Sequence, residues 1–448
     1  MKLLIVSPDY ASHAGPLIEI GRAWNSDYGE AVVATGPAVR DMVAEAGLGW
    51  VELRLGKGSN PGVIEEQLQP VGEDAHLRAF FDATRAGSVA TLGYQADARR
   101  HDLMHDPDGV LDCLCNIVEQ VRPDRIVVDH VAFGARLALH AMGLECASVV
   151  LGHPSALPST GEMFGLPDEW PSGMRPSDDD IADLLVRCGA AVDELARAAD
   201  DFLRRRAPDA SPMNDLTRAP GRPTIYAYPK GLHSPARRLP EHSVFVGSLA
   251  KEQVLGSFPL AVGDGLRVTV ALGSFLSARS DVLQTAVRAA HAAGWRLTLA
   301  HGSTSLSDLG ELPAGASVAR HLPQVALLQH TDVFVNHAGN GSVTESVAAG
   351  VPMVVLPFST DQFAGAAAIE RAGVGAVLAP NSLTPDSLRS TVEGLLTSKA
   401  VERMADVARA SARDGGPRRA AQAIAELSPP LRSPKVPAVA CDRLVGGE

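Results

Sequence analysis

Two successive series of alternating strand-like and helix-like segments are the feature that most constrains the fold of this chain. The first series contains four short apolar runs, at residues 3–6, 31–35, 125–128 and 148–151. The second series begins at Arg267 and continues in the same rhythm to about residue 372. Strands that alternate with helices form parallel sheets covered by helices on both faces. The pattern therefore predicts an α/β protein with two Rossmann-like αβα domains that face each other across a cleft, where ligands of such sheets bind.

Breaks in this rhythm suggest where the domains begin and end. We expect a first domain over residues 1–240 and a second over 241–427, with a linker near 240–255; the length of 448 residues is enough for both. Residues 154–220 are first Pro-rich and then carry long charged helical runs, which predicts a helical insertion in the first domain. The Pro-rich stretch 428–448 is expected to be a poorly ordered tail.

Composition narrows the class of protein and of partner. The net charge of −12 argues against a nucleic acid as the main partner, and no apolar run approaches the roughly 20 residues needed to span a bilayer. The five cysteines are scattered without a zinc-type spacing, which favours reduced thiols. The apolar run at the N-terminus is too short for a signal peptide, so we expect a cytoplasmic protein.

The segment from Val333 to Gln362 carries the most chemical information. A buried strand ends at Asn336, and a loop with glycines at 339 and 341 then begins a helix. Free backbone amides at a helix N-terminus attract anions such as phosphate. Polar side chains around this loop can add hydrogen bonds to a phosphate, a ribose or a sugar: His337, Ser342, Glu345, Asp361 and Gln362.

These spacings resemble the donor-binding signature of family 1 nucleotide-sugar glycosyltransferases, which have the two-domain GT-B fold. The signature reads His-Gly-Gly-x-x-Ser-x-x-Glu, then Gly-Val-Pro, then Asp-Gln; here Ala338 replaces the first glycine, a change that we expect to leave its amide available. The resemblance implies that His337 and Ser342 contact the diphosphate, Glu345 the ribose, and Asp361 and Gln362 the sugar. Gly339, Asn340 and Gly341 complete the predicted loop.

Two further segments resemble parts of the same donor site. His321 stands where the family has a tryptophan that stacks on the base, three residues before Gln324, a predicted base or ribose contact. Gly273 and Ser274 resemble the family's Gly-Ser loop, which touches the phosphate. No cofactor is implied beyond the nucleoside-diphosphate sugar, which serves as a co-substrate.

The first domain supplies a candidate catalytic base. Transfer of a sugar to a hydroxyl needs a group that removes its proton, and His13 stands in the loop after the first strand, before a helix that we expect to start at Pro16. The spacing His-x-x-Pro-Leu resembles the family motif whose histidine is the base, and Asp129 resembles the aspartate that orients it. For His130 and His153 two readings stay open, a place in the acceptor pocket and an ordinary loop histidine.

The resemblance implies an inverting glycosyltransferase, similar to bacterial enzymes that move a sugar from a dTDP- or UDP-sugar to a hydroxyl of a polyketide or macrolide aglycone. Two alternatives stay open: a sugar-nucleotide epimerase, and a non-catalytic auxiliary partner protein. A dinucleotide-binding site is disfavoured, because the glycine loop is not followed by the acidic residue expected at the end of the second strand. The acids at 178–180 start a predicted helix, so no metal site is expected there. The sequence leaves the oligomeric state open, a homodimer included, and does not identify the aglycone or the sugar.

Overall fold

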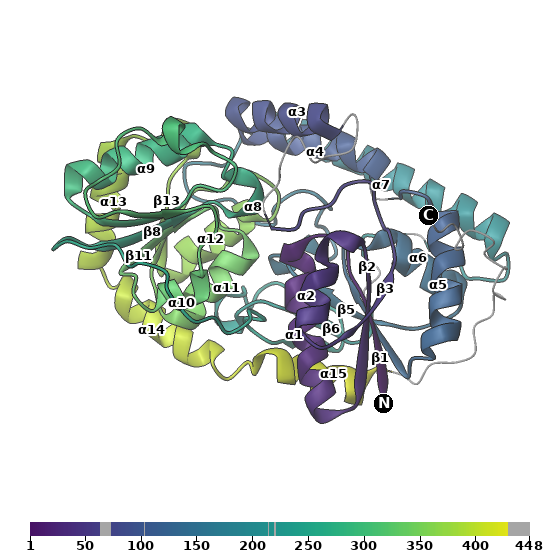
Figure 1. Cartoon of the computed structure of the whole chain (residues 1–448). Helices are drawn as coiled ribbons and strands as arrows, with labels where there is room; N and C mark the ends of the chain where they lie inside the picture. The colour runs from purple at the N-terminus through teal and green to yellow at the C-terminus, as the bar shows by residue number, and fades with distance from the viewer. Residues whose placement is uncertain (63–72, 103, 214, 219–220, 429–448) are drawn as a thin grey trace.

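The computed structural model describes residues 1–62, 73–102, 104–213, 215–218 and 221–428, in two lobes that lie side by side (Figure 1). The first lobe holds a seven-stranded parallel sheet of order β3-β2-β1-β4-β5-β6-β7. Its strands are β1 Lys2–Val6, β2 Glu30–Thr35, β3 Gly49–Glu52, β4 Arg125–Asp129, β5 Ala147–Val150, β6 Thr224–Tyr226 and β7 Ser243–Phe245. Its helices are α1 Ala11–Asp27, α2 Arg40–Glu45, α3 Glu73–Ala86, α4 Ser88–Asp102, α5 Pro107–Val121, α6 Phe133–Ala141 and α7 Asp178–Arg206.

The second lobe holds a six-stranded parallel sheet of order β10-β9-β8-β11-β12-β13. Its strands are β8 Arg267–Ala271, β9 Arg296–Ala300, β10 Ser317–Ala319, β11 Val333–Asn336, β12 Met353–Val355 and β13 Gly375–Val377. The helices that follow the first lobe are α8 Gly273–Leu276, α9 Ser280–Ala293, α10 Gln324–Leu328, α11 Asn340–Ala349, α12 Gln362–Ala372, α13 Pro385–Thr397, α14 Ala400–Ser411 and α15 Gly416–Leu427. The predicted pair of Rossmann-like αβα domains is confirmed.

Both domain ends differ from the boundaries expected at residue 240 and residue 427. Strand β7 pairs in parallel with β6, so the first sheet extends beyond residue 240. Helix α15 packs against α1, and Ala420 and Ile424 are buried in the core of the first domain (Figure 1). The C-terminal helix therefore returns to the first domain because its apolar face finds a partner there.

The helical insertion is larger than the sequence indicated. Helix α7 lies within the predicted insertion and packs along α4, while α3 and α4 precede it in the chain and were not predicted. Leu77 and Phe81 of α3 join the hydrophobic core of the second domain. Helix α3 therefore lies within the first domain in sequence but packs on the second domain, at the top of Figure 1.

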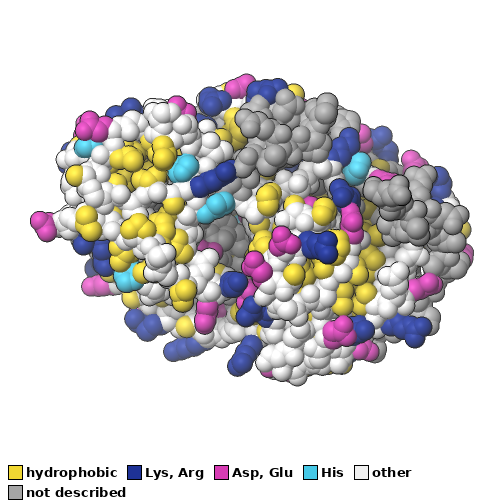
Figure 2. All heavy atoms as spheres, viewed as in Figure 1, with side chains coloured by type: hydrophobic (Ala, Val, Ile, Leu, Met, Phe, Trp, Pro, Cys, Tyr) yellow, Lys and Arg dark blue, Asp and Glu magenta, His cyan; other side chains and the backbone are white. Residues whose placement is uncertain are grey.

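Several expectations from composition can be placed on the described residues. The Ser177 side chain caps α7 by accepting a hydrogen bond from the Asp180 amide, which explains the acidic run at 178–180 as a helix start. Cys113, Cys115, Cys146 and Cys188 are free thiols, while Cys441 and the predicted tail lie outside the described residues. None of the described helices is long and apolar enough to cross a membrane. On the face in Figure 2, described basic and acidic side chains are interspersed.

Candidate functional site

A cleft of about 1010 Å³ lies between the two domains and is lined by residues of both. Of the residues predicted from sequence, the lining contains His13 and His130 from the first domain. From the second domain it contains Gly273, Gln324, His337, Gly339, Asn340, Gly341, Ser342, Glu345, Asp361 and Gln362. The carboxyl ends of the strands in both sheets face this cleft because parallel strands present the same end to one edge.

The first-domain wall carries a histidine–aspartate pair. His13 Nδ1 lies 2.6 Å from Asp129 Oδ2, and the Asp129 side chain is fully buried while that of His13 is 27% exposed. A carboxylate can only accept, so Nδ1 carries the proton and Nε2 is the free acceptor. Burial disfavours the charged forms of both groups, but the attraction between the imidazolium and the carboxylate outweighs this effect. The pKa of His13 is therefore raised, and the pKa of Asp129 is held well below its usual range.

Local structure fixes this pair. Asp129 is the last residue of β4, and its Oδ1 accepts a hydrogen bond from the Val131 amide at 3.1 Å. His13 lies in the first turn of α1, which begins at Ala11 and not at Pro16 as the sequence suggested. Pro16 is the sixth residue of this helix, beyond the first four amides, so its missing amide proton removes one intrahelical hydrogen bond.

On the opposite wall, the N-terminus of α11 points an uncapped set of amides into the cleft. Gly339 is the N-cap residue and no side chain caps the helix. His337 precedes it, and a Cβ atom at Gly273 would lie 2.7 Å from the His337 ring, so only glycine allows this close approach. Burial lowers the pKa of His337 to about 4, which keeps the ring neutral and able to donate one hydrogen bond.

Ala338 differs from the expectation that its amide is available to a ligand. Its N–H donates to Asn336 Oδ1 at 2.8 Å, so this amide is already satisfied inside the protein. The residue also adopts φ +61°, a left-handed conformation that costs a non-glycine residue about 1 kcal/mol or more. A glycine at position 338, as in the family motif, would avoid this strain; the alanine of this chain carries it.

Three of the predicted donor residues form one hydrogen-bonded group. Gln324 at the start of α10 donates to Glu345 Oε2 at 2.7 Å and to Ser342 Oγ at 3.4 Å. Burial raises the pKa of Glu345 to about 7, although the bond from Gln324 partly offsets this. The carboxyl group of Glu345 therefore changes charge near neutral pH and offers a ligand hydroxyl an acceptor at the higher end of that range.

The second-domain residues nearest the first domain already have protein partners. Asp361 Oδ2 accepts from the His153 amide at 2.9 Å, and Asn340 Nδ2 donates to the Ala227 carbonyl at 2.9 Å, so both side chains bridge the domains. Gln362 Oε1 accepts from the amides of residues 358 and 359, and its Nε2 donates to Ser359. Their predicted sugar and donor contacts require exchange of these bonds or use of the remaining lone pairs.

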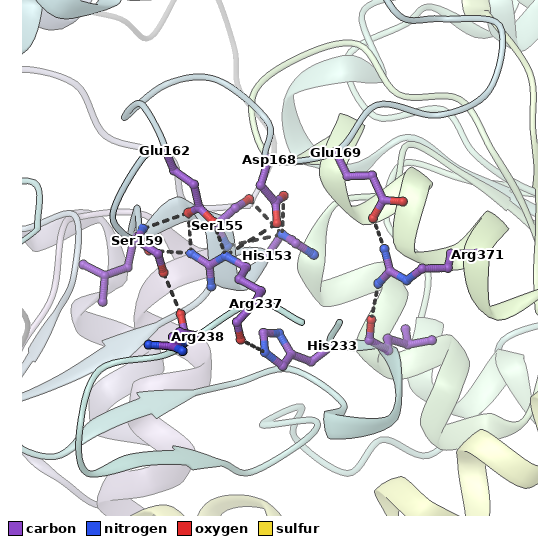
Figure 3. Close-up of polar contacts among 12 residues, drawn as sticks. His153, Ser155, Ser159, Glu162, Asp168, Glu169, His233, Arg237, Arg238 and Arg371 are labelled. Atoms are coloured by element: carbon purple, nitrogen blue, oxygen red, sulfur yellow. Dashed lines mark hydrogen bonds and ion pairs between the residues drawn. The ribbon is translucent and has the colours of Figure 1, made fainter. Parts of the chain in front are cut away.

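Asp129 is linked to the cleft only through His13, two other predicted residues lie away from the lining, and a further one is incompletely described. His153 packs beside Ser155, with Nδ1 2.8 Å from Ser155 Oγ, and Figure 3 shows it facing Asp168 and Arg237. Burial lowers the pKa of His153 to about 3, so its ring is neutral. His321 is exposed and lies near Gly62. Ser274 lies on α8, but its side chain is outside the described residues.

Sequence reasoning missed the wall formed by the insertion. Phe80 of α3, Tyr94 and Arg99 of α4, and Phe164 of the segment between β5 and α7 line the cleft. The only sequence signal for them was the amphipathic pattern of α3, because aromatic and basic residues in a helix do not indicate which cavity they face.

Comparison with known proteins supports the predicted kinship. Residues 295–427 match the family described as "Erythromycin biosynthesis protein CIII-like, C-terminal domain". The oleandomycin glycosyltransferase of Streptomyces antibioticus is 36% identical over 210 residues, 46% of this chain and 49% of that protein. The chain thus spans about half the length of this relative in that match.

Two further relatives cover nearly the whole chain. The 10-deoxymethynolide desosaminyltransferase of Streptomyces venezuelae is 25% identical over 414 residues, 90% of this chain and 91% of that protein. The crystal structure of the glycotransferase of kitacinnamycin superposes with a TM-score of 0.68 at 25% identity, covering 96% of this chain and 99% of that chain. The resemblance seen in the sequence motifs is confirmed, and so is the two-domain fold that it implied.

Proposed function

We propose that this chain is a GT-B natural-product glycosyltransferase that transfers a sugar to a hydroxyl of a small-molecule natural-product aglycone. The relatives named for transfer to macrolides support this substrate class. The donor is a nucleoside-diphosphate sugar, with the dTDP and UDP forms both open. The observation that carries the proposal is that one cleft holds the His13–Asp129 pair on one wall and the uncapped start of α11 on the other.

The chemistry follows from the two walls. His13 Nε2 takes the proton of the acceptor hydroxyl while that oxygen forms a bond to the anomeric carbon of the donor sugar. The bond from the anomeric carbon to the diphosphate oxygen breaks in the same step. A single displacement from the side opposite the diphosphate inverts the anomeric centre.

The leaving diphosphate gains negative charge as that bond breaks. The α11 amides and the neutral His337 ring donate hydrogen bonds toward the place where this charge develops. The carboxylate of Asp129 meanwhile stabilises the imidazolium that forms on His13. Residues 336–365 contain no Lys or Arg, so within this segment dipoles and a neutral imidazole meet the diphosphate.

A mass-spectrometric screen of dTDP- and UDP-sugars against polyketide and macrolide aglycones tests the proposal. Transfer by the native protein and its loss in His13→Ala are the expected results. Full transfer by His13→Ala would refute the role of the base. Conversion of a donor without any aglycone would favour the epimerase alternative, and binding of donor without any chemistry would favour the auxiliary one.

A further inference from the structure

Arg99 is a charged side chain of the cleft that forms no ion pair with any described carboxylate. Arg99 of α4 is half-buried in the lining, and among the described residues no carboxylate lies within ion-pair distance of its guanidinium. Asp361 is near enough to affect it electrostatically, but its oxygens accept hydrogen bonds from Thr360 and His153. Burying an unpaired charge is costly, so a counter-charge from outside the protein is the arrangement that physical chemistry favours here.

The position of Arg99 is fixed by packing. Its guanidinium carbon lies 4.9 Å from the centre of the Phe164 ring, which stacks the planar group on an aromatic face. Gly165 has φ +95°, and a Cβ atom there would collide with Nη1 of Arg99. The guanidinium is therefore held in place before any ligand binds, and its fork of N–H donors matches the two oxygens of a carboxylate.

The surfaces around Arg99 are aromatic and contain unsatisfied polar atoms. The rings of Phe133 and Phe164 pack edge to face with their centroids 5.6 Å apart, and the ring centroids of Phe80 and Tyr94 are 6.4 Å apart. Gln95 Oε1, on the same helix as Arg99, is buried without a hydrogen-bond partner. Among the described lining residues of α3, α4, α6 and the 155–166 loop, Arg99 alone carries a fixed charge.

We propose that Arg99 determines acceptor specificity by pairing with a carboxylate of a flat, aromatic aglycone that lies against Phe164. The inference rests on the proposed function and adds the chemical class of its acceptor. A flat ring system fits the aromatic wall, and one anionic group neutralises the one fixed charge. The hydroxyl that receives the sugar lies on the same aglycone and faces His13 across the cleft.

Calorimetric titration with matched probes tests this proposal without turnover. The probes are 6-hydroxy-2-naphthoate, which is an anion at pH 7, and its neutral methyl ester. The native protein should bind the acid about tenfold or more tightly than the ester, because a hydrogen bond to a charged group is worth that much. Arg99→Gln should remove this preference by weakening the acid and should change ester binding by less than about twofold. Arg187→Gln is the matched control, since Arg187 pairs with Asp97 outside the cleft lining.

Titration of the same proteins with thymidine and uridine diphosphates separates this inference from the proposed function. Native protein and Arg99→Gln should bind the nucleotide equally, which also shows that the variant is folded. Equal binding of acid and ester by the native protein, no binding of either probe, or an unchanged preference in Arg99→Gln would overturn the role of Arg99. Failure of the native protein to bind either nucleotide would instead overturn the proposed function.

Discussion

Replacing Asp129 by Asn is the sharpest test of the catalytic pair, because the two hydrogen bonds of Asp129 fix the outcome. Its Oδ1 accepts from the Val131 amide at 3.1 Å, while Oδ2 faces His13 Nδ1 at 2.6 Å. In Asp129→Asn the amide oxygen keeps the backbone bond, so the NH₂ group is turned toward His13. A donor facing Nδ1 forces the proton onto Nε2, and Nε2 can then no longer accept a proton from the acceptor hydroxyl.

The magnitude follows from the same contact. A hydrogen bond to a charged group contributes about 1.5–3 kcal/mol, and one pKa unit corresponds to about 1.4 kcal/mol. The pKa of His13, which Asp129 raises, should therefore fall in the variant. Because His13 acts as a base only when neutral, the acid limb of the pH–rate profile should move to lower pH. The plateau of kcat should fall by about 10²–10⁴ from loss of the correct tautomer.

Initial rates of product formation between pH 5 and pH 9, measured by mass spectrometry, would give both quantities. Asp124→Asn is a suitable control, since Asp124 precedes the same strand and bonds to the Lys2 amide far from the cleft. A variant at position 129 that keeps more than about a third of the native kcat, with an unmoved acid limb, would refute the tautomer argument.

Three further predictions concern the donor side and the contact between the domains. Donor KM should fall as pH rises through about 7, where Glu345 ionises, and Glu345→Gln should abolish that dependence in the same rate assay. Gly273→Ala should displace the ring of His337, which should weaken nucleotide binding, measured by calorimetry, at least about tenfold and lower the free energy of unfolding by about 1–3 kcal/mol. The control Gly394→Ala, in open space on α13, should instead raise the free energy of unfolding in urea by about 0.5–1 kcal/mol. Arg279→Met removes a buried guanidinium that bonds to α3, so limited proteolysis should cleave near α3 faster than in the native protein, and an unchanged cleavage rate would contradict the role assigned to that contact.

The loop between β11 and α11 could be predicted because its residues are close in sequence, whereas His321, from another segment, lies away from the cleft lining. A strand, a glycine loop and a helix N-terminus within thirty residues fix one another's geometry, so His337, Ser342 and Glu345 lie where the motif predicted. One expectation for this loop was wrong: the Ala338 amide is not free for a ligand, because it donates to the Asn336 side chain, a contact that the residue types do not indicate.

The acceptor half depended on contacts between residues distant in sequence. His13 and Asp129 were paired in the prediction because both resemble residues of the family's catalytic pair, and His13 Nδ1 lies 2.6 Å from Asp129 Oδ2. His153 was considered for the pocket because it follows a strand, yet its ring packs beside Ser155 and its amide donates to Asp361 of the other domain.

The sequence by itself determined two parallel sheets, the anion-binding loop and the identity of the candidate base, since each depends on periodicity or on neighbours along the chain. Only the tertiary structure decided that α15 returns to the first domain, that α3 packs on the second, and that Arg99 faces the cleft without a carboxylate partner among the described residues. These features depend on contacts between elements that are far apart in the sequence. The burial and pairing of a side chain there depend on atoms hundreds of residues away, so no local pattern can encode them.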